Sequence, residues 1–360
     1  MNEVLIAGGG IVGAACARFF LKAGYRVTVI EQDVPGGGAT ASGMGHIVVM
    51  DDSEAQFALT LRSRQLWDSL VDEMPESVEF VRSGTLWIAA DDEELQAVQP
   101  KLAYYRDRGV GCELLDVKQL YEAEPHLRKG MAGGFLVPDD SVIYAPCAAR
   151  WLMQGAQLRR GNVVEMGDGW LRLGGGERLE ADVAICAMGI WATTLFPALP
   201  VKPRKGHLVI TDRYPGNVRH QMVELGYLKS AHGHSNESVA FNVQPRKTGQ
   251  LLIGSSRQYG VLDGRVEAHM ISAMLSRALD YLPGLENMSA LRSWTGFRAA
   301  TPDKLPLVGL CPGMQRTYIA TGHEGLGITT SLGTAELLLD AVSGRSGVLH
   351  QADYAVARAM

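Results

Sequence analysis

The chain begins with an alternation of apolar and amphipathic segments that predicts a strand, a helix and a second strand. Residues 4–7 are uniformly apolar, as expected for a strand buried on both faces. The next pattern predicts a helix from about Ile11 to Ala23, with Gly24 as its C-terminal cap. The apolar run 26–30 supplies the following strand. A parallel α/β sheet is therefore expected at the start of the fold.

Two later segments repeat the pattern of a buried strand followed by glycine. Residues 182–187 predict a strand that turns at Met188-Gly189. Residues 317–345 predict a strand over 318–320, a glycine loop and a helix with apolar positions at helical spacing. Because ligands of open α/β sheets lie outside the carboxyl ends of their strands, both turns are candidate parts of a binding site. For 182–187 alone, one more core strand with a turn is an equal alternative.

The regions between these segments are patterned differently. Strand-like stretches at 83–88, 207–210 and 250–254, with an acidic helical stretch over 91–109, predict an antiparallel sheet. The glycines around 167–169 and 174–176 indicate tight hairpins.

Composition narrows the class of protein. The 360 residues are 46% hydrophobic, and 34 basic against 39 acidic residues give a net charge of −5, which argues against nucleic acid or an anionic membrane as the main partner. The apolar run 4–21 contains four glycines and Arg18, so no membrane span is expected. Five scattered cysteines without a C-x-x-C pair predict reduced thiols in a cytoplasmic protein and no metal site.

A Gly8-x-Gly10-x-x-Gly13 motif joins the first strand to the first helix. Gly8 permits the tight turn, Gly10 lets a pyrophosphate approach the backbone, and Gly13 lets helix and strand pack closely. The helix N-terminus offers N–H groups and partial positive charge to phosphates. Glu31, 18 residues after Gly13, is placed to accept hydrogen bonds from ribose hydroxyls and would repel a 2′-phosphate, which argues against NADP. The motif alone does not separate FAD from NAD.

The segments that follow favour FAD. Residues 36–46 form a Gly/Ser/Thr-rich stretch in which Thr40 and Ser42 can offer hydroxyls to pyrophosphate, although a flexible surface loop is an alternative. The glycine loop 322–327 aims a second helix N-terminus at the site, which stabilises the anionic reduced flavin by about 0.3–2 kcal/mol. No second G-x-G-x-x-G follows a strand, so we predict FAD reduced by substrate and not by NAD(P)H.

The predicted fold is a discontinuous Rossmann-like FAD-binding domain over 1–78, 137–200 and 296–360, with an α+β substrate-binding domain on an antiparallel sheet over 79–136 and 201–295. The predicted FAD contacts come from the three glycine-rich regions and the strand ends beside them: Gly8, Gly10, Ile11, Val12, Gly13, Glu31, Gln32, Thr40, Ala41, Ser42, Gly43, Gly45, His46, Val164, Ala187, Gly189, Trp191, Arg298, Gly325, Leu326, Gly327, Ile328 and Thr329.

With these motifs, the chain resembles the D-amino acid oxidase-like (DAO) family of FAD oxidoreductases from Val4 to Arg345. Residues 296–309 are similar to that family's G-x-R-x-x-T-x-D-x-x-P-x-x-G stretch. The resemblance implies that Arg298 binds a substrate carboxylate, for which a planar guanidinium is suited. A structural Arg298–Asp303 pair is the alternative.

The resemblance also implies how FAD and substrate are held. Relatives with cysteinyl FAD carry a cysteine where this chain has Gly296, which implies non-covalent FAD, with histidyl attachment at His46 as the less favoured alternative. Further substrate contacts are expected from histidines and tyrosines in segments that face the flavin, although each such residue is more often structural: His46, His207, Tyr227, Tyr259 and His323.

Residues 41–67 resemble the D-hydroxyproline dehydrogenase β-subunit branch, beside the glycine and sarcosine oxidase branch. This implies oxidation of a C–N bond by hydride transfer from Cα to flavin N5, converting cis-4-hydroxy-D-proline to a cyclic imine. The alternatives are a glycine, sarcosine or D-amino acid oxidase that reduces O2 to H2O2, and a non-catalytic FAD-binding subunit. The electron acceptor is then O2 or a separate subunit of a hetero-oligomer, because the chain has no cysteine set for an iron–sulfur cluster.

Overall fold

A computed structural model describes residues 2–226 and 237–359, so Tyr227 lies outside the described residues. The chain divides into two compact units, each assembled from separate segments. Unit 1 comprises Met1–Val78, Ile143–Arg204 and Phe297–Met360; unit 2 comprises Glu79–Val142 and Lys205–Gly296. Unit 1 resumes at residue 143, later than the expected 137, because β6 (Gly133–Val137) pairs with β4 (Thr85–Ala89) in the sheet of unit 2.

Unit 1 is built on a six-stranded sheet with the order β18-β19-β12-β1-β2-β8. Its pairs are parallel except β18 with β19, and every strand expected from the buried apolar runs is present. The strands are β1 (Glu3–Ala7), β2 (Arg26–Glu31), β8 (Gln157–Arg160), β12 (Val183–Cys186), β18 (Leu307–Leu310) and β19 (Thr317–Thr321).

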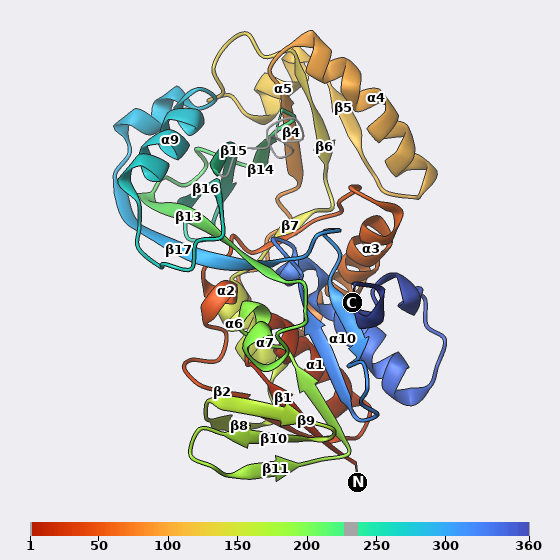
Figure 1. The fold of residues 1–360 in the computed structure, drawn as a ribbon. Coiled ribbons are helices and arrows are strands. Elements are labelled where there is room, and N and C mark those ends of the chain that lie inside the picture. Colours follow the sequence, from red (N-terminus) through yellow and green to blue (C-terminus); the bar gives the residue numbers. More distant parts are fainter. Residues whose placement is uncertain (1, 227–236, 360) are drawn as a thin grey trace. The chain divides into compact units, whose positions relative to one another are not determined.

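The helices of unit 1 pack through small side chains. Helix α1 contacts α10 and α6, and α10 contacts α3 (Figure 1). Ala14, Ala15 and Ala17 of α1 are fully buried, which lets the neighbouring helix approach closely. Gly24 (φ +87°) follows the C-cap, as expected. The helices are α1 (Ile11–Lys22), α2 (Gly38–Ala41), α3 (Glu54–Asp68), α6 (Ala145–Leu152), α7 (Ala192–Leu195) and α10 (Gly327–Ser343).

A small antiparallel sheet lies beside the main sheet of unit 1, with the order β11-β10-β9. Its strands are β9 (Val163–Gly167), β10 (Trp170–Leu173) and β11 (Arg178–Glu180). Gly169 (φ +77°) and Gly176 (φ +88°) occupy the two turns, so the hairpins expected from the glycines are confirmed.

Unit 2 is built on an eight-stranded sheet with the order β17-β13-β16-β15-β14-β4-β6-β5. The prediction of an antiparallel sheet is wrong for one pair of strands, because β14 pairs with β4 in parallel. Segments from distant parts of the chain meet there without a hairpin connection. Its remaining elements are β5 (Glu113–Leu115), β7 (Ser141–Val142), β13 (Lys202–Arg213), β14 (Gln221–Glu224), β15 (Glu237–Pro245), β16 (Gln250–Tyr259), β17 (Ala290–Ala300), α4 (Asp92–Asp107), α5 (Val117–Ala123) and α9 (Ala268–Leu279).

Each unit has its own apolar core. Leu5, Ile30 and Ile319 lie in the core of unit 1, and Leu86 and Phe241 in that of unit 2. Within residues 2–226 and 237–359, no helix combines the length and apolar character that crossing a membrane requires. Short 3-10 helices complete the fold: Val71–Glu73, Glu76–Val78, Gly189–Trp191, Pro283–Asn287, Gln351–Asp353 and Val356–Ala359.

The packing of α1 on β1 gives a prediction for stability. A Cβ placed on Gly13 would lie 2.0 Å from the Gly8 carbonyl oxygen, so Gly13→Ala requires the backbone to move. We expect the free energy of unfolding, measured by chemical denaturation, to fall by about 3 kcal/mol, at the upper end of overpacking costs. Gly175→Ala is the matched control, because no atom lies within 4 Å of its added Cβ. Equal stabilities of the two variants would contradict this account.

Candidate cofactor and substrate site

The turn between β1 and α1 leaves no room for side chains. Gly8 has φ +105°, and a Cβ there would lie 2.5 Å from the Ala187 carbonyl oxygen at the end of β12. Gly10 is the N-cap of α1 and has no side chain to occupy the space beyond the helix end. The first turn of α1 carries no acidic residue. Its positive dipole end is therefore left for an anion.

Thr40 holds the start of α1 from the second glycine-rich segment. Its Oγ1 accepts the N–H of Ile11 at 2.9 Å, and the side chain is buried. The expected 36–46 loop contains the one-turn helix α2 and leads into β3 (His46–Ile47). A hydroxyl that accepts one helix N–H keeps its own proton, so the expectation that Thr40 donates it to pyrophosphate stays a prediction.

Glu31 ends β2 as expected and faces the glycine turn. Its Oε2 accepts the N–H of Gly9 at 2.8 Å, and its Oε1 accepts the N–H of Asp33 at 3.0 Å. Each carboxylate oxygen has a second lone pair, so the group can still accept ribose hydroxyls. Glu31 thus organises the turn as well as offering acceptors to a nucleotide.

The carboxyl end of β12 lies beside the same turn. Ala187 N–H donates to the Ala7 carbonyl at 2.8 Å, and Gly189 (φ +56°) then begins the 3-10 turn that ends at Trp191. Thr321 Oγ1 donates to the Gly189 carbonyl at 2.7 Å and so ties this turn to the end of β19. Trp191 is 47% exposed, which leaves its ring free to cover a ligand.

The N-terminus of α10 is fixed by side chains from α3 and β3. Trp67 Nε1 donates to the carbonyls of Ile328 and Thr329, at 3.2 and 3.1 Å. Thr329 Oγ1 donates to the His46 carbonyl at 2.9 Å, and His46 Nε2 lies 3.2 Å from the Gly325 carbonyl oxygen. Trp67 was not among the predicted site residues; the apolar pattern of 54–68 places it in a helix but does not show which segment its ring reaches.

Arg298 lies on β17 beside the loop that precedes α10. A Cβ placed on Gly325 would be 3.6 Å from Arg298 Nε, so the guanidinium side chain lies against this loop. Asp303, the alternative partner of Arg298, accepts from Arg358 Nε at 2.9 Å and from Arg358 Nη2 at 3.2 Å. Arg358 is close in space only because the C-terminal segment returns to this part of unit 1.

Two of the predicted substrate contacts are engaged within the fold. His207 is fully buried in unit 2; its Nδ1 lies 3.0 Å from Ser256 Oγ and its Nε2 accepts the N–H of Glu267 at 3.2 Å. Both ring nitrogens have hydrogen-bond partners within the fold, so the prediction that His207 contacts substrate is wrong. His323 is 8% exposed and its Nε2 lies 2.9 Å from Thr334 Oγ1 of α10, which gives it a structural role.

Tyr259, a predicted substrate contact, and Val164 and Gln32, two predicted FAD contacts, stay predictions. Tyr259 ends β16 in unit 2 and is 43% exposed. Val164 is 47% exposed on β9, and the Gln32 carbonyl accepts from Arg160 Nε at 3.3 Å. All the predicted FAD contacts lie in unit 1.

An ion pair that the sequence does not reveal orders the loop before α10. Glu324 has φ +50°, its N–H donates to the Ala299 carbonyl at 2.8 Å, and its carboxylate pairs with Arg204. A non-glycine residue in this left-handed conformation needs such support. The two residues are 120 positions apart, so no local motif could have identified the pair.

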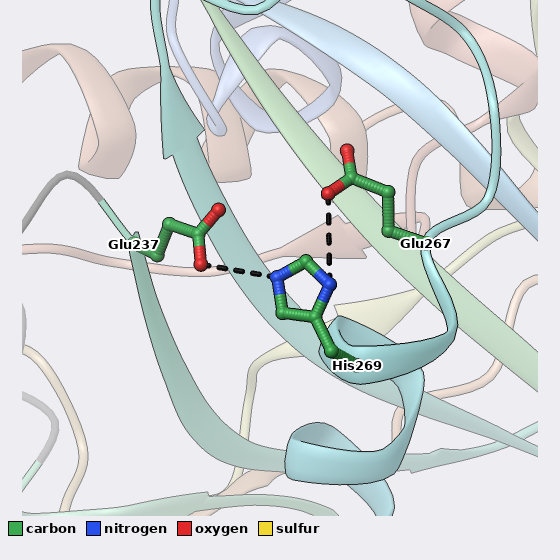
Figure 2. Close-up of side chains that lie close together, drawn as sticks. All are labelled: Glu237, Glu267 and His269. Atoms are coloured by element: carbon green, nitrogen blue, oxygen red, sulfur yellow. Dashed lines mark hydrogen bonds and ion pairs between the residues drawn. The ribbon is translucent and has the colours of Figure 1, made fainter.

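Unit 2 contains a separate group of charged side chains (Figure 2). His269 of α9 lies between Glu237 and Glu267, 3.1 and 3.7 Å from their carboxylate oxygens. These three residues could offer ligands to a cation. However, the buried Lys205 ammonium already pairs with Glu267 at 2.6 Å, and Gln258 donates to both carboxylates. The group is fully explained as an ion-pair network joining β13, β15, β16 and α9.

The residues present in unit 1 fit FAD. The glycine turn, the α1 N-terminus and Glu31 suit the pyrophosphate and ribose, and the α10 N-terminus suits an anionic ring edge. His46 Nδ1 is buried and has no hydrogen-bond partner among the described residues. A buried polar atom of this kind indicates that a bound ligand, either the cofactor or the substrate, completes the site.

Comparison with known proteins agrees with this geometry. Residues 3–341 match the family described as FAD dependent oxidoreductase (DAO). The chain is 27% identical to glycine oxidase of Geobacillus kaustophilus, covering 99% of this chain and 97% of that protein, and its fold superposes on a crystal structure of that enzyme with a TM-score of 0.89 over the whole of both chains. It is also 27% identical to hydrogen cyanide synthase subunit HcnC of Pseudomonas aeruginosa, over 93% of this chain and 91% of that one. The chain belongs to the DAO family of FAD-dependent oxidoreductases.

The Glu31 contacts predict its effect on FAD affinity. Glu31→Ala removes the acceptor for Gly9 N–H and for the ribose, so we expect the FAD dissociation constant to rise about 10- to 100-fold, as for loss of a hydrogen bond to a charged group. Glu31→Gln keeps one neutral acceptor, so its FAD dissociation constant should lie between those of wild type and Glu31→Ala. Titration of apoprotein with FAD, followed by flavin fluorescence, gives the constants. An unchanged constant in Glu31→Ala would remove Glu31 from the nucleotide site.

His46, which is partly buried, and His323, which is buried, predict how stability depends on pH. Burial lowers the pKa of both His46 and His323 from 6.5 to about 4. Between pH 6.5 and pH 4 the unfolded chain therefore binds protons that the folded chain does not, so the free energy of unfolding falls as the pH drops through this window. Each histidine should contribute a loss of about 3 kcal/mol, complete below pH 4.

Denaturation at several pH values measures this slope. His323→Gln should reduce the loss between pH 6.5 and pH 4 by about 3 kcal/mol, whatever its effect on stability at pH 7. The change in His323→Gln is compared with that in His350→Gln, which removes an exposed histidine. The account fails if His323→Gln and wild type lose stability equally.

Proposed function

We propose that this protein oxidises the C–N bond next to the carboxylate of an amino or imino acid, with FAD bound non-covalently in unit 1. The observation that carries the proposal is the position of Arg298 against Gly325, at the loop that begins α10. A guanidinium there can pair bidentately with a carboxylate beside the residues suited to the flavin. The identity to glycine oxidase over almost the whole chain supports a substrate with an amine and a carboxylate.

When bound, FAD supplies a two-electron acceptor for hydride from the substrate carbon. The protein's own side chains then have to bind, orient and exclude water. Arg298 anchors the carboxylate, and the α10 N-terminus, fixed by Trp67 and Thr329, places its dipole where negative charge develops. The substrate amine is bound neutral; it would lose hydride from Cα to the two-electron acceptor and a proton from nitrogen to water, so that the product is an imine. No strong base is required, because orientation supplies much of the rate.

The best substrate candidate is cis-4-hydroxy-D-proline. Its support is the resemblance of residues 41–67 to the hydroxyproline dehydrogenase branch. Glycine, sarcosine and D-proline are the alternatives, and the relation to glycine oxidase favours a small amino acid.

The first experiment is the visible spectrum of the purified, FAD-loaded protein under anaerobic conditions, before and after each of these four compounds. Bleaching of the flavin absorption by cis-4-hydroxy-D-proline alone supports the specific proposal. Bleaching by glycine or sarcosine replaces that substrate but keeps the reaction class. A flavin that every amine leaves oxidised, while dithionite reduces it, would overturn the proposed reaction in favour of a non-catalytic FAD-binding subunit.

The electron acceptor divides the proposal into two forms. A dehydrogenase passes electrons to a partner subunit, and the similarity to a protein named as a subunit, HcnC, favours this form. An oxidase passes them to O2. Measuring H2O2 during aerobic turnover separates them, because only the oxidase produces peroxide in proportion to substrate consumed.

We also propose a cytoplasmic location. All five cysteines are free thiols. Burial raises the pKa of Cys16 and Cys186 to about 12, so neither is a reactive thiolate near neutral pH. Fractionation of cells expressing the tagged protein tests this location.

Arg298 gives the sharpest mutational test of the proposed reaction. Arg298→Ala should lower kcat/KM by about 100-fold, equivalent to about 3 kcal/mol, while FAD remains bound. Arg298→Lys keeps the charge without the bidentate geometry, so its kcat/KM should lie between those of wild type and Arg298→Ala. Arg292→Met, an exposed arginine on the same strand that stacks on Trp294, is the control. Wild-type kinetics in Arg298→Ala would exclude Arg298 as the anchor.

A further inference from the structure

His46 is attached to the start of α10 at two points. Its carbonyl oxygen accepts the Thr329 hydroxyl at 2.9 Å, and its ring Nε2 lies 3.2 Å from the Gly325 carbonyl oxygen. These contacts fix both the backbone and the ring plane of His46 relative to the loop. The ring is therefore a rigid part of unit 1.

The hydrogen bond to Gly325 determines the tautomer of His46. A carbonyl oxygen only accepts, so Nε2 carries the proton and Nδ1 presents a bare lone pair. Nδ1 is buried, and no residue in the described part of the chain donates to it. An unsatisfied buried acceptor costs about 1–3 kcal/mol, so the site lacks one donor.

The neighbours of His46 indicate what that donor is. The charge of Arg298 acts on the imidazole, and the Arg298 side chain lies against Gly325, the residue to which His46 is bonded. The Arg298 guanidinium, a cation suited to a carboxylate, and the His46 imidazole, a neutral acceptor, therefore both lie against the loop at Gly325. An amino acid offers the complementary pair, because its amine N–H is only two bonds from the carboxylate carbon. The edges of the flavin ring offer mainly acceptors, for which the α10 N-terminus is the suited partner.

We propose that His46 Nδ1 accepts a hydrogen bond from the amine N–H of the same substrate whose carboxylate Arg298 binds. This inference rests on the proposed function and adds a second specificity-determining contact to it. His46 selects substrates that carry an N–H next to the carboxylate, and it directs the nitrogen lone pair away from the imidazole. It does not remove a proton, because burial holds the pKa of its ring at about 4.

Two matched ligands test this contact without turnover. Pyrrole-2-carboxylate and 2-furoate have the same shape and carboxylate, but the first has a ring N–H where the second has an ether oxygen. Their dissociation constants are measured on the FAD-loaded enzyme from the change in flavin absorption. Wild type should bind pyrrole-2-carboxylate about 5- to 10-fold more tightly, as one neutral hydrogen bond predicts.

Two substitutions separate the two ring nitrogens. His46→Gln reaches the position of Nε2 and can still donate to the Gly325 carbonyl, but it has no acceptor in place of Nδ1. His46→Asn has an amide oxygen at about the reach of Nδ1. The preference for pyrrole-2-carboxylate should vanish in His46→Gln and persist in His46→Asn.

Other outcomes overturn the inference. Equal binding of the two ligands by wild type, including no binding of either, shows that no acceptor meets the N–H. A preference that survives in His46→Gln assigns it to another residue. Equal weakening of both ligands, together with a changed flavin spectrum and FAD dissociation constant, assigns Nδ1 to the cofactor. The proposed function fails separately, if amines do not bleach the wild-type flavin.

Discussion

The close approach of α1 to β1 at Gly13 is the contact on which the cofactor site depends. It brings the α1 N-terminus to the sheet edge where the strands β1, β2 and β12 end. Glu31 and Ala187 from the two neighbouring strands then meet the same glycine turn, one by a hydrogen bond and the other by van der Waals contact. A side chain at Gly8 or Gly13 would separate these three strand ends, and the acceptors and helix dipole would no longer converge.

A second helix end completes the site, and it is held by side chains instead of by close backbone packing. Trp67 from α3 and Thr329 within α10 position the first turn of α10, and His46 is attached to the same turn. Arg298 reaches this loop from β17. The α1 end therefore suits phosphates, and the α10 end combines donors, a cation and one acceptor, as a ring with an adjacent amino acid requires.

Contacts between distant segments decided what the sequence alone left open or predicted wrongly. Besides the expected contact with pyrophosphate, Thr40 has a role that the sequence does not show: the fold brings its hydroxyl to Ile11, whose helix N–H needs an acceptor. His207 lies in a predicted strand, and only the sheet order shows that Ser256 and the N–H of Glu267 satisfy its ring. Asp303, the alternative partner of Arg298, accepts hydrogen bonds from Arg358 of the C-terminal segment. In each of these hydrogen-bonded pairs the two residues are more than 25 positions apart in the sequence.

The sequence by itself determined the strands, the helix after each glycine turn and the FAD-type cradle, because these follow from local apolar periodicity and from positions where only glycine fits. A motif with fixed spacing also indicated Arg298 as the candidate ligand of a substrate carboxylate. Only the tertiary structure decided which polar side chains remain available to a ligand. Whether a histidine, threonine or aspartate is free depends on which distant donor or acceptor the packed chain places beside it, and a buried polar group takes the partner that is nearest in space.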